Sequence, residues 1–139
     1  METLQELGYG PIDLVCVNLY PFVETAAREP PATDSELIEM IDIGGPTMVR
    51  SAAKNHKDVI VLTSPSQYEG IIQKLRVADG NPSAIDMETR ANLALESFQG
   101  TAAYDTAVSN ELESRLSDKQ TPSRVQLASQ AGTSLRYGE

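Results

Sequence analysis

The chain has 139 residues with 20 acidic and 11 basic side chains, which gives a formal net charge of −9 and a pI near 4.5. Hydrophobic residues make up 40% of the chain, enough for the core of one globular domain and too many for a disordered acidic tail. The negative charge argues against nucleic-acid binding, and no apolar run is long enough to predict a membrane span. One cysteine and one histidine argue against a disulfide framework and a metal site. We expect a cytoplasmic protein.

Residues 2–8 are expected to form a short helix or the end of one, and the first strand is expected in residues 13–19, a nearly continuous apolar run that ends before Pro21. A short apolar run between turn residues is typical of a strand buried on both faces, as in a parallel sheet covered by helices. Cys16 lies in this run and is expected to be a small buried hydrophobe.

Two helix starts follow. Thr33 and Glu36 form a capping-box pattern that predicts a helix over 34–40. Two glycines and a proline then predict a second helix over 46–55, with Pro46 at the first helical position.

The second half repeats the alternation of strand and helix. Residues 59–62 are a second buried-strand pattern, and a capping box from Ser64 to Gln67 opens an amphipathic helix. The longest helical pattern covers 86–116, with Gly100 as its weak point. Its expected apolar positions are Met87, Ala91, Ala94, Leu95, Phe98, Ala102, Val108 and Leu112.

Strands that alternate with helices indicate the α/β class with a parallel sheet. Two strands are few for such a sheet, because a parallel strand buried on both faces needs neighbours at its edges. The sequence therefore predicts either further strands that its pattern does not reveal or a piece of a longer domain.

Candidate functional residues gather where the strands are expected to end. Ligands of open α/β sheets lie beyond the carboxyl ends of the strands, and helix N-termini favour anions. Thr47, Arg50, Ser51 and Lys54 are spaced to share one helix face. A phenol, a carboxylate and an ammonium group near such a turn could transfer protons. The candidates around the turn are Asn18, Tyr20, Asp42, Gly44, Gly45 and Lys54.

Each candidate also has a structural interpretation. Tyr20 could be a packing aromatic, Asp42 a helix cap, and Lys54 a solvated cation at a helix end. Residues 50–57 carry three bases and no acid, whereas residues 1–49 carry nine acids and one base. This basic island suits either the helix dipole or a bound anion.

Four segments together carry a resemblance to a known family: Val17–Phe22, Ile41–Asn55, Phe98–Asp105 and Leu135–Glu139. In this order they resemble the PurH family of purine biosynthesis, whose members join AICAR transformylase to IMP cyclohydrolase. The resemblance covers essentially the whole chain. It implies a methylglyoxal-synthase-like, Rossmann-like α/β fold.

The resemblance also implies a reaction. In the cyclohydrolase step, 5-formamidoimidazole-4-carboxamide ribotide (FAICAR) closes to inosine monophosphate (IMP) as its carboxamide nitrogen attacks the formyl carbon and water is lost. No metal or redox cofactor is implied for this step. The co-substrate 10-formyltetrahydrofolate belongs to the transformylase half, and the full-length protein is expected to be a homodimer.

Site residues are implied position by position. Lys54 resembles the lysine that donates and accepts the proton, and Tyr20 and Asp42 resemble its partners. Gly100 stands where the family usually has a histidine, so no role of that histidine is carried over. Residues that resemble nucleotide contacts are Val17, Asn18, Asp42, Ile43, Gly44 and Gly45, and those that resemble AICAR contacts of the transformylase half are Arg136 and Tyr137.

The resemblance further implies that residues 1–116 are the C-terminal portion of the cyclohydrolase domain and that residues 117–139 are a linker and the start of the transformylase domain. The phosphate-contacting loops and a Lys-Thr-Leu-His segment of the family have no match here. We therefore expect the isolated chain to show little or no cyclisation. The alternative is a non-catalytic domain of the same fold that binds a nucleotide or phosphate.

Overall fold

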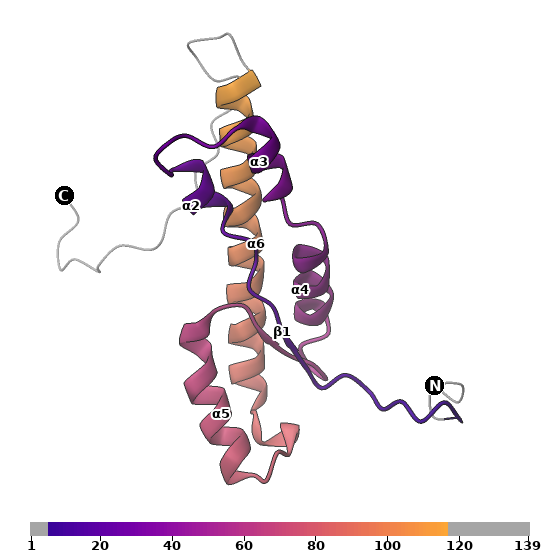
Figure 1. Cartoon of the computed structure of the whole chain (residues 1–139). Coiled ribbons are helices and arrows are strands. Elements are labelled where there is room, and N and C mark those ends of the chain that lie inside the picture. The colour runs from indigo at the N-terminus through magenta and orange to yellow at the C-terminus, as the bar shows by residue number, and fades with distance from the viewer. Residues whose placement is uncertain (1–5, 117–139) are drawn as a thin grey trace, which may run out of the picture.

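A computed structural model describes residues 6–116 of the chain. Its elements, in order, are β1 (Leu14–Cys16), α2 (Phe22–Ala26), α3 (Asp34–Glu39), α4 (Gly44–Lys54), β2 (Ile60–Leu62), the 3₁₀ turn η1 (Pro65–Gln67), α5 (Tyr68–Val77), the 3₁₀ turn η2 (Pro82–Ala84) and α6 (Met87–Leu116). In Figure 1, α6 runs like a column through the molecule, with α2 and α3 along its upper part, α4 beside its middle and α5 beside its lower part. The predicted α/β class is confirmed.

The two strands pair in parallel, and Leu14 lies opposite Ile60 in the register. All three residues of β2 are buried, as predicted, because α4 and α6 both pack against this strand. The prediction that β1 is buried on both faces is wrong. Leu14 and Cys16 are exposed, and only Val15 between them turns toward the core. In the described part of the chain β1 pairs with β2 alone, so its second edge and one face stay uncovered.

Two apolar clusters lie along α6. The larger cluster surrounds β2 and includes Val49 and Ala53 of α4 and Leu93 of α6. The smaller cluster joins Phe22 of α2 and Leu37 of α3 to the second half of α6. Because the clusters occupy different stretches of one helix, α6 fixes the α2–α3 segment relative to the sheet.

The face of α6 that is buried differs from the predicted one. Leu95 and Phe98 are 55% and 39% exposed, whereas Ser97 and Thr101 are each 1% exposed. The hydroxyls of Ser97 and Thr101 donate to carbonyls of their own helix, at Leu93 and Phe98. Small hydroxyl side chains that are satisfied in this way can be buried without a partner across the interface.

Both capping boxes are confirmed. Thr33 accepts from the Glu36 amide at the start of α3, and the Gln67 side chain accepts from the Ser64 amide at η1. Helix α4 begins at Gly44, two residues before the predicted start, so Pro46 is not its first residue. A side-chain cap from Asp42 allows the earlier start, as described next.

Candidate active site

The end of β1 and the start of α4 meet at the carboxylate of Asp42. Its Oδ1 accepts a hydrogen bond of 2.7 Å from the Gly45 amide, in the first turn of α4. Its Oδ2 accepts a longer bond of 3.4 Å from the Tyr20 amide, in the segment that follows β1. One carboxylate therefore bridges the two segments that the sequence predicted to form a site.

Gly45 is the residue that lets Asp42 approach so closely. A Cβ atom on Gly45 would lie 2.4 Å from Oδ2 and 2.8 Å from Cγ of Asp42, well inside contact distance. A Cβ atom on Gly44 would meet nothing within 4 Å. The two adjacent glycines thus have different roles, because only a side chain at position 45 would displace the Asp42 carboxylate. The Gly45 amide is also already occupied, so the helix start offers an anion fewer free donors than the sequence suggested.

The segment after β1, residues 17–20, is fixed by hydrogen bonds to Leu62 and Tyr68. The Val17 amide donates to the carbonyl of Leu62 at 2.9 Å, and its side chain packs against the larger cluster. The Asn18 side-chain oxygen accepts from the Tyr68 hydroxyl at 3.0 Å. A hydrogen bond with Cys16, together with desolvation, raises the pKa of Tyr68.

Tyr20 and Lys54 are more open. Tyr20 is 54% exposed, and Ile43 beside Asp42 is 75% exposed. Within residues 6–116, neither the Tyr20 hydroxyl nor the Lys54 ammonium group has a hydrogen-bond or ion-pair partner. Both groups are therefore available to a ligand.

An exposed polar stripe runs along α4, formed by Gly44, Thr47, Ser51 and Lys54. At a rise of 1.5 Å per residue, the backbones of Gly44 and Lys54 are about 15 Å apart. Arg50 is directed elsewhere, because its guanidinium carbon lies 5.5 Å from the centre of the Phe98 ring on α6. A single ligand would have to lie along the stripe to reach from Asp42 to Lys54.

Tyr104 of α6 is a part of this site that the sequence did not single out. Its hydroxyl accepts a 2.8 Å bond from the Asp42 amide and donates a 2.8 Å bond to the carbonyl of Met40. These partners are 62 and 64 residues away in the sequence. The only signal for Tyr104 in the sequence is that it lies in a segment that carries the family resemblance.

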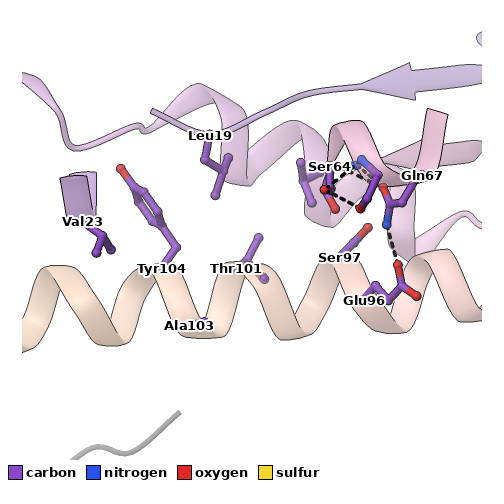
Figure 2. A pocket seen from close by; sticks show the side chains of 13 residues that line it. Leu19, Val23, Ser64, Gln67, Glu96, Ser97, Thr101, Ala103 and Tyr104 are labelled. Carbon is purple, nitrogen blue, oxygen red and sulfur yellow. Dashed lines mark hydrogen bonds between the residues drawn. The ribbon is translucent and has the colours of Figure 1, made fainter. Parts of the chain in front are cut away.

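A pocket of about 450 Å³ lies beside this site, between α6 and the segments that follow the two strands (Figure 2). Leu19 lines it, whereas Asn18 and Tyr20 do not. Val17 and Leu19 are partly buried, whereas Asn18 and Tyr20 are exposed, so the pocket and the latter two residues lie on different sides of the chain. Gly100 also lines the pocket, and Ser64, Gln67 and Glu96 form its polar end.

Arg136 and Tyr137 lie outside the described residues. Among residues 6–116 no group of three or more His, Cys, Asp or Glu side chains is placed to hold a metal ion. No helix in that range combines the length and apolar character that crossing a membrane requires.

Residues 52–139 match the model of a family described as the AICARFT/IMPCHase bienzyme. The chain belongs to this family. It is 46% identical over 139 residues to the bifunctional purine biosynthesis protein PurH of Ligilactobacillus salivarius, covering 100% of this chain and 26% of the relative. It is also 46% identical over 140 residues to the PurH of Petrotoga mobilis, covering 100% of this chain and 27% of that relative. The chain thus spans about a quarter of the length of these curated relatives.

A solved structure supports the same fold. The crystal structure of ForH is similar with a TM-score of 0.68 and 39% sequence identity, over 80% of this chain and 55% of that one. The predicted parallel sheet flanked by helices, compatible with part of a methylglyoxal-synthase-like fold, is confirmed by this likeness.

Proposed function

We propose that this chain acts in purine biosynthesis, in the closure of FAICAR to IMP. The carboxamide nitrogen attacks the formyl carbon and gives up one of its two protons, and the formyl oxygen takes up a proton to become a hydroxyl. This hydroxyl then leaves as water with the proton of the formamido nitrogen, as the new carbon–nitrogen double bond forms. The observation that carries the proposal is the Asp42 carboxylate, which joins the end of β1 to the start of α4 through two backbone amides. Membership of the bienzyme family supports the choice of this reaction among those that such a site could perform.

The nucleotide lies along the exposed stripe of α4 in this proposal. It contacts the backbone near Ile43 and the two glycines at one end of the stripe, with Val17 and Asn18 as further contacts, and its base reaches toward Lys54 at the other end. Tyr20 and Lys54 have no partners among the described residues, so they are available to bind the reacting groups. Lys54 then donates and accepts the proton, with Tyr20 and Asp42 as its partners. The enzyme's contribution is to hold the two reacting groups in close contact.

The rest of the proposal concerns the whole protein. We place residues 1–116 in the cyclohydrolase domain and residues 117–139 in a linker that leads to the transformylase domain. Arg136 and Tyr137 then bind AICAR, and 10-formyltetrahydrofolate is the formyl donor of that second half. The whole protein is a cytoplasmic homodimer in this proposal.

Calorimetric titration of IMP, the reaction product, into the 139-residue chain tests nucleotide binding. We expect Lys54→Ala to weaken binding, because it removes the cation at the far end of the stripe. Lys57→Ala is the matched control, since it removes a cation of the same basic island from the turn after α4. Equal losses in both variants would indicate a non-specific charge effect and would contradict the proposed role of Lys54.

A binding module without catalysis is the second candidate. The exposure of Tyr20 and Lys54 favours it, because within residues 6–116 no neighbour forms a hydrogen bond or ion pair that would orient either group for proton transfer. A chimera separates the two functions: this chain replaces the matching segment of the Ligilactobacillus salivarius PurH, and IMP formation is followed by absorbance. The enzyme proposal predicts turnover that Lys54→Ala abolishes in a folded protein. A chimera that binds IMP and does not turn over FAICAR would support the binding module.

A further inference from the structure

The Tyr104 hydroxyl of α6 forms two hydrogen bonds to the segment that carries Asp42, whose residues Met40 and Ile41 also pack in the smaller apolar cluster. Met40 and Asp42 lie between α3 and α4, and their backbone carbonyl and amide both bond to the Tyr104 hydroxyl at 2.8 Å. A backbone amide and carbonyl in a partly buried turn must be paired, and here one phenol pairs both. The position of Asp42 is therefore set from the middle of α6.

Asp42 in turn fixes its neighbours. Its carboxylate contacts the Gly45 amide at 2.7 Å and fills the space where a side chain of Gly45 would be. It also reaches the Tyr20 amide at 3.4 Å, which is already a long hydrogen bond. A small displacement of the Asp42 backbone would break this second contact, and with it the link between the Asp42 carboxylate and the Tyr20 backbone.

Tyr104 is itself well anchored. Its ring packs edge-to-face against Phe22, with 6.2 Å between ring centres, and it belongs to the smaller apolar cluster with Val108. Figure 2 shows the ring standing up from α6 between Leu19 and Val23, with its hydroxyl directed away from the helix. Burial raises the pKa of Tyr104, so the hydroxyl stays protonated at neutral pH and keeps its ability to donate to Met40.

We propose that Tyr104 is a positioning residue for the nucleotide site: its hydroxyl holds the Met40–Asp42 turn so that the Asp42 carboxylate bridges the start of α4 and the segment after β1. This inference rests on the proposed function for its ligand, and its structural part can be tested without any ligand. Removing the hydroxyl should release Asp42 and weaken nucleotide binding, although Tyr104 touches no nucleotide.

The test compares Tyr104→Phe with Val108→Ala. The first variant deletes only the hydroxyl, and the second removes packing from the same cluster and leaves the hydroxyl in place. We expect amide hydrogen exchange at Asp42 to become about tenfold faster in Tyr104→Phe alone, as the loss of a hydrogen bond in a partly buried turn implies. We also expect the dissociation constant for IMP to rise about fivefold in Tyr104→Phe, a typical factor for one net hydrogen bond, and to stay unchanged in Val108→Ala.

Each outcome has a distinct meaning. If the unmodified chain does not bind IMP, the proposed function fails, and faster exchange at Asp42 still decides whether Tyr104 holds the turn. If exchange at Asp42 is unchanged in Tyr104→Phe, the positioning role is overturned. If Tyr104→Phe does not fold while Val108→Ala does, or if both variants weaken IMP binding equally, the hydroxyl is structural only and the inference is wrong.

Discussion

Replacing Gly45 with alanine probes the contact on which the candidate site depends. The new Cβ atom would lie 2.4 Å from Oδ2 and 2.9 Å from Oδ1 of Asp42, so the carboxylate must rotate away. The charged hydrogen bond to the helix amide is then lost, at a cost of about 1.5–3 kcal/mol. Alanine regains up to about 1 kcal/mol through its higher helix propensity. The net destabilisation is therefore about 1–2 kcal/mol.

Gly44→Ala is the matched control, because a Cβ atom there meets nothing within 4 Å. This variant should be neutral or more stable by up to about 1 kcal/mol, since only the helix propensity changes. Thermal unfolding of both variants, followed by circular dichroism, measures the difference. At about 3–5 °C per kcal/mol for a chain of this size, Gly45→Ala should melt several degrees below Gly44→Ala. Equal melting temperatures would refute the role assigned to the Asp42 cap.

Three further predictions concern stability. Gly100→Ala should raise the free energy of unfolding by up to about 1 kcal/mol in a urea titration, because a Cβ atom there meets nothing within 4 Å; a loss of stability would show that the site is crowded. Arg90→Met should cost about 1–3 kcal/mol by the same method, because it leaves the carbonyl of the buried residue Ile85 without its side-chain donor, whereas the Pro82 carbonyl keeps its bond from the Ile85 amide; an unchanged or higher stability would mean that desolvation of the guanidinium outweighs its hydrogen bonds. The hydrogen bond from Arg28 lowers the pKa of Glu36 from 4.5 to about 2, so the stability that this contact contributes is present above pH 4.5 and is lost as the pH falls toward 2. Thermal melts across this range should show a smaller acid-induced loss in Glu36→Gln than in the control Glu39→Gln, and identical profiles would contradict the assignment.

Local signals in the sequence were sufficient to predict the positions of most of the helices. The capping boxes at Thr33 and Ser64 mark the beginnings of α3 and η1, because a cap is formed by residues only three positions apart. The start of α4 was misplaced by two residues because Pro46 was taken as the first helical position, although the Asp42 side chain and the Gly45 amide that it caps are also three positions apart. The contact with Tyr104 spans 62 residues and leaves no periodic pattern.

Burial was harder to predict than secondary structure. The apolar run around Cys16 indicated a covered strand, yet in the described chain β1 has one partner strand and an exposed face. On α6, hydrophobicity favoured Leu95 over Ser97, although Ser97 is the buried one. A serine that bonds to its own helix loses little on burial, and the space between packed elements selects small side chains there. The different roles of Gly44 and Gly45 likewise depend on where the Asp42 carboxylate lies.

Mapping the nucleotide by NMR tests the central claim most directly. In a titration of the ¹⁵N-labelled chain with IMP, the account predicts shifts in the amides of Asn18, Gly44 and Gly45 and at the Lys54 end of α4. The amide resonances of Ser97 and Thr101, which lie on the pocket side of α6, should not shift. Shifts confined to the pocket residues, or no shifts at millimolar IMP, would contradict the claim that the nucleotide lies along α4 beside Asp42.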